Sequence, residues 1–97
     1  MTVLLEHRGR RFKVMAYHDA IRHDGPALEL AEQVDGELGP ALVTVLFAED
    51  RADEAEVLLA DCSLPLQVLT AFVEEVVQEK RRIRETSLYQ VESGDAS

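Results

Sequence analysis

The 97-residue chain has one cysteine, no tryptophan and only ten basic residues, and each shortage excludes a class of protein. Cys62 alone cannot form an intramolecular disulfide or supply a thiolate cluster for zinc. Because only five side chains are aromatic, two Tyr and three Phe, we do not expect an aromatic-lined ligand pocket. The 19 acidic residues leave a formal net charge of −9, whose long-range field repels nucleic acid and anionic membranes.

Long hydrophobic runs and catalytic motifs are also missing. The longest apolar stretch, residues 41–48, is far shorter than the roughly 20 residues of a membrane-spanning helix. Residues 1–6 lack the cationic region of a secretory signal, so we predict a soluble, cytoplasmic protein without membrane association. No glycine-rich phosphate loop and no Ser-His-Asp order is present, and we therefore predict no catalytic residues and no cofactor.

Apolar residues make up 46% of the sequence and are spread along its whole length. This content is sufficient for one hydrophobic core, and a chain of this size normally forms one domain. We predict a single α+β domain over residues 1–90, followed by a polar tail over 91–97 that we expect to be disordered.

The N-terminal quarter has the alternation of a β-hairpin. Phe12, Val14 and Ala16 share one side of residues 11–17, and Arg8–Gly9 separates this run from a β-rich segment at 2–6. The near-continuous apolar run at 41–48 predicts a third strand, covered on both faces.

Three further segments have apolar residues at helical spacing. We predict one helix that begins at Pro26, with Gly36 as a plausible stop and the Gly39–Pro40 break as its limit, so that it extends at most over residues 26–38. We predict another helix over 49–61. Pro65 begins the third, a long amphipathic helix that continues to about Glu85. The predicted order is ββαβαα, with a small sheet packed by helices.

The long C-terminal helix carries the strongest functional signal. At about 1.5 Å per residue it is roughly 30 Å long, more than twice the radius of gyration of about 13 Å expected for a globule of this size. The helix must therefore either cross the whole body or project from it. A projecting apolar stripe requires a partner, and a second copy of the chain is the simplest one. The predicted dimer interface consists of Leu66, Leu69, Phe72, Val73, Val76, Val77, Lys80 and Ile83.

Positive charge gathers in the N-terminal hairpin, at Arg8, Arg10, Arg11 and Lys13. Residues 1–24 have a net charge of +2, whereas residues 25–64 carry ten acids and one base. A solvated hairpin is the simplest interpretation of the basic run. The alternatives are contact with an anion, with the acidic surface of a protein partner, or with nucleic acid.

Two weaker clusters contain residues that catalyse or bind metals. His18–Asp19, His23–Asp24 and His7 offer imidazole and carboxylate ligands, although a spacing of five residues separates the two later histidines on a helix. Cys62 continues the apolar stripe of the 49–61 segment and is expected in the core, with a reactive thiol as the alternative.

These observations favour a small acidic homodimeric protein-interaction or adaptor module without catalytic activity. The first alternative is a small metal-dependent hydrolase or thiol enzyme that uses His7, His18, His23 or Cys62. The second is nucleic-acid binding through the basic hairpin, with an affinity that falls steeply with salt.

Overall fold

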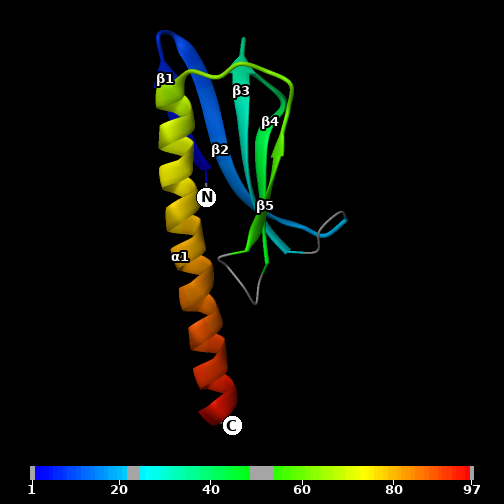
Figure 1. Cartoon of the computed structure of the whole chain (residues 1–97), viewed down its shortest axis with the longest axis vertical. Coiled ribbons are helices and arrows are strands. Elements are labelled where there is room, and N and C mark those ends of the chain that lie inside the picture. The colour runs from blue at the N-terminus through cyan, green and yellow to red at the C-terminus, as the bar shows by residue number, and fades with distance from the viewer. Residues whose placement is uncertain (1, 22–24, 49–53, 97) are drawn as a thin grey trace.

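A computed structural model of the chain describes the backbone of residues 2–21, 25–48 and 54–96, and the side chains in these ranges as far as Glu85. Five strands form one antiparallel sheet in sequence order, and a single helix follows them (Figure 1). The elements are β1 (Thr2–His7), β2 (Arg10–Asp19), β3 (Gly25–Val34), β4 (Glu37–Phe47), β5 (Ala55–Leu59) and α1 (Leu66–Ala96).

Two tight turns fix the register of the sheet. Arg8 and Gly9 connect β1 to β2, and Asp35 and Gly36 connect β3 to β4; all four residues have positive φ, between 50° and 82°. Positive φ at both central residues is the conformation whose twist matches that of the flanking strands. Glycine adopts it without a steric penalty, and aspartate tolerates it better than most residues.

β4 is longer than the part of β3 with which it pairs. From the Gln33–Leu38 pair to the Leu30–Val43 pair there are three steps along β3 and five along β4, so β4 contains two extra residues. Extra residues of this kind form β-bulges, which bend a strand and increase its twist. Gly39 lies in this stretch, where a Cβ atom would come within 3.3 Å of the Glu32 carbonyl oxygen.

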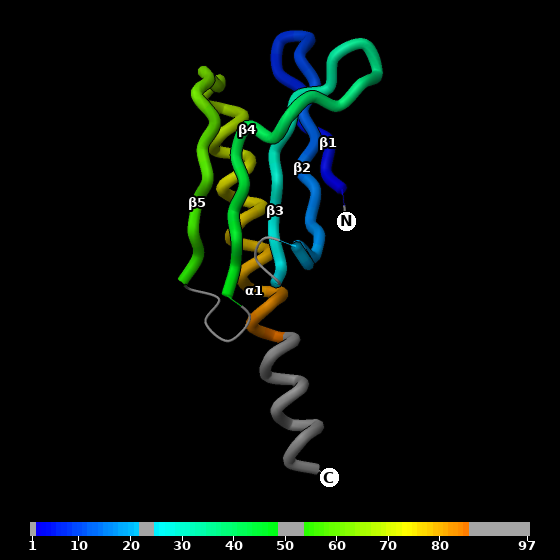
Figure 2. Tube along the Cα trace, turned by 90° about the vertical axis from the view of Figure 1, so that its right-hand side faces the viewer, coloured from blue at the N-terminus to red at the C-terminus, as the bar shows by residue number. Residues whose placement is uncertain are grey.

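The helix packs on one face of the sheet, and the hydrophobic core lies between them (Figure 2). Cross-strand partners such as Val14 and Leu30 point to the same face because side chains alternate along each strand. α1 contributes Val68, Phe72 and Ile83. The strands contribute Phe12, Val14, Leu28, Leu30, Val43, Val45 and Phe47.

An ion pair covers one end of this core. The Arg10 guanidinium donates two hydrogen bonds of 2.9 Å to the Glu32 carboxylate and lies 5.0 Å from the centre of the Phe12 ring. The hydrogen bonds from Arg10 hold the pKa of Glu32 below its ordinary value. A carboxyl whose pKa is lower in the folded state stabilises the fold above its unfolded pKa, and this contribution disappears as pH falls through the folded pKa.

We expect Glu32→Gln to lower the melting temperature slightly at pH 7 and to have no effect near pH 3. The effect is small because both side chains are partly exposed to solvent. Thermal unfolding of both proteins between pH 3 and pH 7 measures it. A difference that persists unchanged in acid would show that packing, and not the ion pair, causes it.

The predicted ββαβαα fold is wrong: the structure has five strands and one helix over the described residues. Residues 26–38, predicted as a helix, form most of β3, the Asp35–Gly36 turn and the start of β4. The second predicted helix, 49–61, includes β5, while residues 49–53 lie outside the described residues. Both segments are rich in Ala, Leu and Glu, which favour helices, but strand pairing on both sides of β3 overrides this local preference.

The other three predicted elements, the N-terminal hairpin, the strand at 41–48 and the long helix, are present in the structure. β1 and β2 pair as the N-terminal hairpin, the apolar run at 41–48 lies largely within β4, and a long helix follows Pro65. The division into a domain over 1–90 and a tail over 91–97 stays a prediction.

Candidate functional site

The helix α1 presents apolar residues on two sides rather than one. Val68, Phe72 and Ile83 face the sheet and are buried. Leu66, Leu69, Val73 and Val77 follow one another at steps of three and four residues and are exposed. Since each residue turns a helix by about 100°, this second stripe lies roughly a third of a turn from the buried one. It is therefore a flank of the helix, beside the sheet contact.

The strand β5 continues this exposed flank. Val57 and Leu59 pair with the core residues Val45 and Val43, so their side chains lie on the same face of the sheet as α1. They are nevertheless 55% and 74% exposed, because β5 is the edge strand and no described residue lies beyond it. Comparing Figures 1 and 2 shows that β5 is the strand nearest the viewer in Figure 1.

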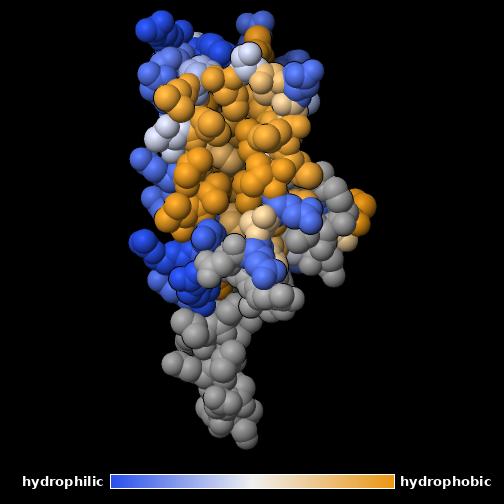
Figure 3. Space-filling view, in the orientation of Figure 1, coloured by the Kyte–Doolittle hydropathy of each residue, from blue (hydrophilic) through white to orange (hydrophobic). Residues whose placement is uncertain are grey.

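Together these side chains form one continuous apolar surface along the open side of the sheet and helix layers (Figure 3). We call it the edge patch. Exposed apolar patches of this kind mark interaction sites on soluble proteins more often than singly scattered apolar residues do. The edge patch consists of Val57, Leu59, Leu66, Leu69, Val73 and Val77.

The predicted dimer interface divides between the core and this patch. Phe72 and Ile83 are 2% and 6% exposed and pack within the chain's own core, while Val76 and Lys80 are partly buried. The other predicted residues, Leu66, Leu69, Val73 and Val77, are the exposed ones. Sequence reasoning missed Val57 and Leu59 because it predicts a helix for their segment. The continuous apolar run of residues 57–59 has no apolar-polar alternation that would have indicated a strand.

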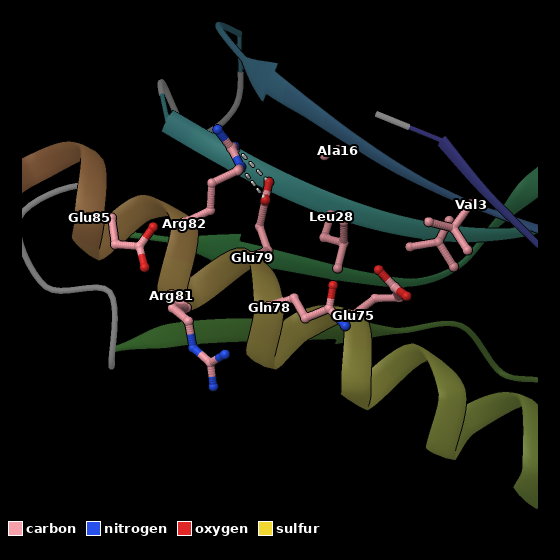
Figure 4. Close-up of a pocket in the computed structure, with 10 residues that line it drawn as sticks. Val3, Ala16, Leu28, Glu75, Gln78, Glu79, Arg81, Arg82 and Glu85 are labelled. Atoms are coloured by element: carbon pink, nitrogen blue, oxygen red, sulfur yellow. Dashed lines mark hydrogen bonds and ion pairs between the residues drawn. The ribbon is translucent and has the colours of Figure 1, made fainter.

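The opposite flank of α1 borders an open cleft of about 340 Å³ (Figure 4). Its apolar floor comes from Val3, Val14, Ala16 and Leu28, and its polar wall from α1. The polar wall consists of Glu75, Gln78, Glu79, Arg81, Arg82 and Glu85.

Glu79 is the most buried acid of this wall, at 5% exposure. The Arg82 guanidinium donates hydrogen bonds of 2.7 and 3.0 Å to its two carboxylate oxygens. These hydrogen bonds raise the pKa of Arg82, which stays protonated. Since both carboxylate oxygens are occupied, the pair neutralises itself inside the cleft and Glu79 is not presented as a free base.

We expect Arg82→Ala to destabilise the fold more than Glu79→Gln does. Removing the arginine leaves a nearly buried carboxylate without its partner, at an expected loss of about 1–3 kcal/mol in the free energy of unfolding. Glu79→Gln removes the charge together with the pair and is expected to lose less. Urea unfolding of the two variants gives the comparison, and the reverse order would contradict it.

The four basic residues of the hairpin do not form one surface. Arg10 lies on the helix side of β2, whereas Arg11 and Lys13 alternate to the other face. Arg10 is paired with Glu32, and Arg11 lies 4.0 Å from the Glu6 carboxylate. The predicted anion or partner contact through Arg8, Arg10, Arg11 and Lys13 is therefore divided between two faces and the turn.

The histidines are separated in the same way. His7 pairs with Arg10 at one end of β2, and His18 lies eight residues farther along the strand, about 26 Å away. The Asp19 side chain accepts a hydrogen bond from the Ile21 amide, at 3.2 Å. His23 and Asp24 lie outside the described residues. Within the described part of the chain, no three His, Cys, Asp or Glu side chains are grouped to hold a metal.

Cys62 is exposed, so the prediction that it belongs to the core is wrong. It lies in the connection between β5 and α1, where its amide donates to the Ala60 carbonyl at 2.9 Å. The segment containing it is not a helix, and the apolar stripe that the core prediction relied on does not exist.

Comparison with known proteins adds no functional information. No family model matches the chain, and neither curated proteins nor solved structures give a significant match. Among the described residues, no helix is both long and apolar enough to cross a membrane. The candidate function therefore depends on the geometry of the chain itself.

Proposed function

We propose that this protein is a homodimeric protein-interaction module that associates through the edge patch. The observation that carries the proposal is the continuity of the patch. An edge strand and one flank of the helix both expose apolar side chains on the same side of the molecule. Burying such side chains is favourable by about 25 cal/mol for each Å² removed from water.

The charge of the chain supports a second copy as the occupant. All six residues of the edge patch are uncharged, in a protein whose charged residues make up 30% of the sequence. A basic partner would be recognised by acidic side chains, and the patch contains none. A second copy supplies an identical apolar surface, and the two surfaces meet about a two-fold axis.

The proposed dimer has a distinctive response to salt. Two chains of charge −9 repel each other at long range, and added salt screens this repulsion. We expect the dimer dissociation constant to fall between 20 mM and 500 mM NaCl, a range that shortens the screening length from roughly 20 Å to a few ångströms. Sedimentation equilibrium at several salt concentrations measures it.

The same measurement separates this proposal from association through opposite charges. If the basic hairpin of one chain contacted the acidic middle segment of another, the dissociation constant would rise with salt. A mass of 10.8 kDa, that of one chain, at high micromolar concentration and at every salt concentration would overturn the proposal.

A further inference from the structure

The backbone of β5 has an unused hydrogen-bonding edge. The Ala60 amide donates to the Leu42 carbonyl and the Ala48 amide donates to the Glu54 carbonyl. These two bonds show which residues of β5 direct their backbone groups toward β4. In an antiparallel ladder the residues alternate between those that bond to the neighbouring strand and those that point away from it. Ala55, Val57 and Leu59 consequently direct their amide and carbonyl groups away from β4, and no described strand lies there.

This edge lacks the features that protect edge strands from pairing. Over Ala55–Leu59 there is no proline, no lysine and no register shift, and Glu56 is the only charged residue. The other edge strand, β1, carries a charged residue, Glu6, whose carboxylate lies 4.0 Å from Arg11 on the outer face of the sheet. β5 alone adjoins the edge patch, through the side chains of Val57 and Leu59.

We infer that β5 pairs antiparallel with β5 of a second copy, across a two-fold axis at Val57. This inference rests on the proposed homodimer and specifies how its subunits meet. An antiparallel pair of identical strands is symmetric about such an axis, so an edge strand is always complementary to itself. Val57 bonds with the partner's Val57, and Ala55 bonds with the partner's Leu59. The product is a continuous ten-stranded sheet.

This pairing also turns the helical part of the edge patch toward the partner. Residues opposite each other in paired strands point to the same face, so both copies of α1 lie on one face of the joined sheet. The axis makes the two helices antiparallel. Leu69, Val73 and Val77 are spaced by four residues on each side of Val73, so Leu69 faces the partner's Val77 when Val73 lies at the axis.

The native Cys62 provides a direct test, because it is the only cysteine and is exposed. The ladder continues to Ala60, three residues beyond Val57, so at about 3.3 Å per residue the two Ala60 residues of the dimer are about 20 Å apart. Cys62 follows two residues later, after the turn closed by its hydrogen bond to Ala60, so the two Cys62 residues are about 20–30 Å apart. We expect pulsed electron-spin measurements on the nitroxide-labelled protein to give a main distance between about 25 and 40 Å, allowing for the length of the label. A dimer without a distance in this range would overturn the inference and leave the proposed function standing. A monomer would overturn both.

Amide exchange supplies a second, independent measurement. Strand pairing protects the Val57 and Leu59 amides, so their exchange slows at least tenfold as the concentration is raised from mostly monomer to mostly dimer. The Gly36 amide, in a distant turn, serves as the internal reference. Unchanged exchange of Val57 in a proven dimer would overturn strand pairing.

A proline variant tests the same hydrogen bonds by mutation. Val57→Pro removes an amide that points away from β4, so the ladder within the chain is kept while the bonds at the axis are lost. Val57→Ala shortens the side chain and keeps the amide. We expect the proline variant to raise the dimer dissociation constant at least tenfold more than the alanine variant, with circular dichroism confirming that both are folded. Equal effects would overturn the inference.

Discussion

Val73→Asp is expected to convert the proposed dimer into a monomer of 10.8 kDa that keeps its fold. Val73 is 49% exposed and lies in the middle of the edge patch, so the substitution leaves the chain's own core unchanged. In the dimer, each aspartate would be buried without a partner. At about 3 kcal/mol for each of two such charges, the dissociation constant rises by roughly 10⁴-fold.

The control for this variant is Gln78→Asp. Gln78 lies on the opposite flank of α1, beside the cleft, and is also exposed. It adds the same negative charge to the same helix but replaces a polar side chain on the other side of α1, so it leaves the apolar edge patch intact. Analytical ultracentrifugation should show a monomer for Val73→Asp and a dimer for Gln78→Asp. Equal weakening in both would mean that charge repulsion, and not the edge patch, controls association.

Phe72→Ala is expected to cause the largest loss of stability. Phe72 is 2% exposed and is the largest side chain that α1 inserts into the core. Truncating a buried phenylalanine costs about 3–5 kcal/mol, because apolar contacts are lost and a cavity remains. In a domain of this size the melting temperature falls by about 15 °C or more.

This effect is best measured in the Val73→Asp background, so that dimer formation does not contribute to the melting temperature. Leu66→Ala is the matched control on the same helix. Leu66 is 71% exposed, so we expect its truncation to change the free energy of unfolding of the monomer by about 0.5 kcal/mol or less. If Phe72→Ala were equally mild, α1 would not be packed against the sheet as described.

The two tight turns show how local signals determined part of the fold. Arg8–Gly9 separates a β-rich segment from an alternating one and predicts a hairpin, which is present. Asp35–Gly36 is an even stronger hairpin signal, because both residues are among those that tolerate positive φ. The helical spacing of the apolar residues in 26–34 instead predicts that Gly36 ends a helix. Giving the turn priority over the periodicity would have predicted β3 and the start of β4 as well.

Local sequence signals also predicted only part of the candidate site. The spacing of Leu66, Leu69, Val73 and Val77 follows directly from the sequence of the helix. Phe72 and Ile83 are buried and these four residues are exposed because of where the sheet contacts α1. Spacing alone does not show which residues of a wide apolar stripe face the core.

The sequence by itself determined that this chain is acidic, has one core and ends in a long amphipathic helix, because charge, apolar content and helical periodicity are properties of neighbouring residues. Only the tertiary structure decided that β3 and β5 are strands, and that the helix divides its apolar residues between the core and the edge patch. Those outcomes depend on contacts between residues far apart in the chain, which override local helix preference. The fold likewise decided that the single cysteine, Cys62, lies on the surface, where a label can report on the proposed dimer.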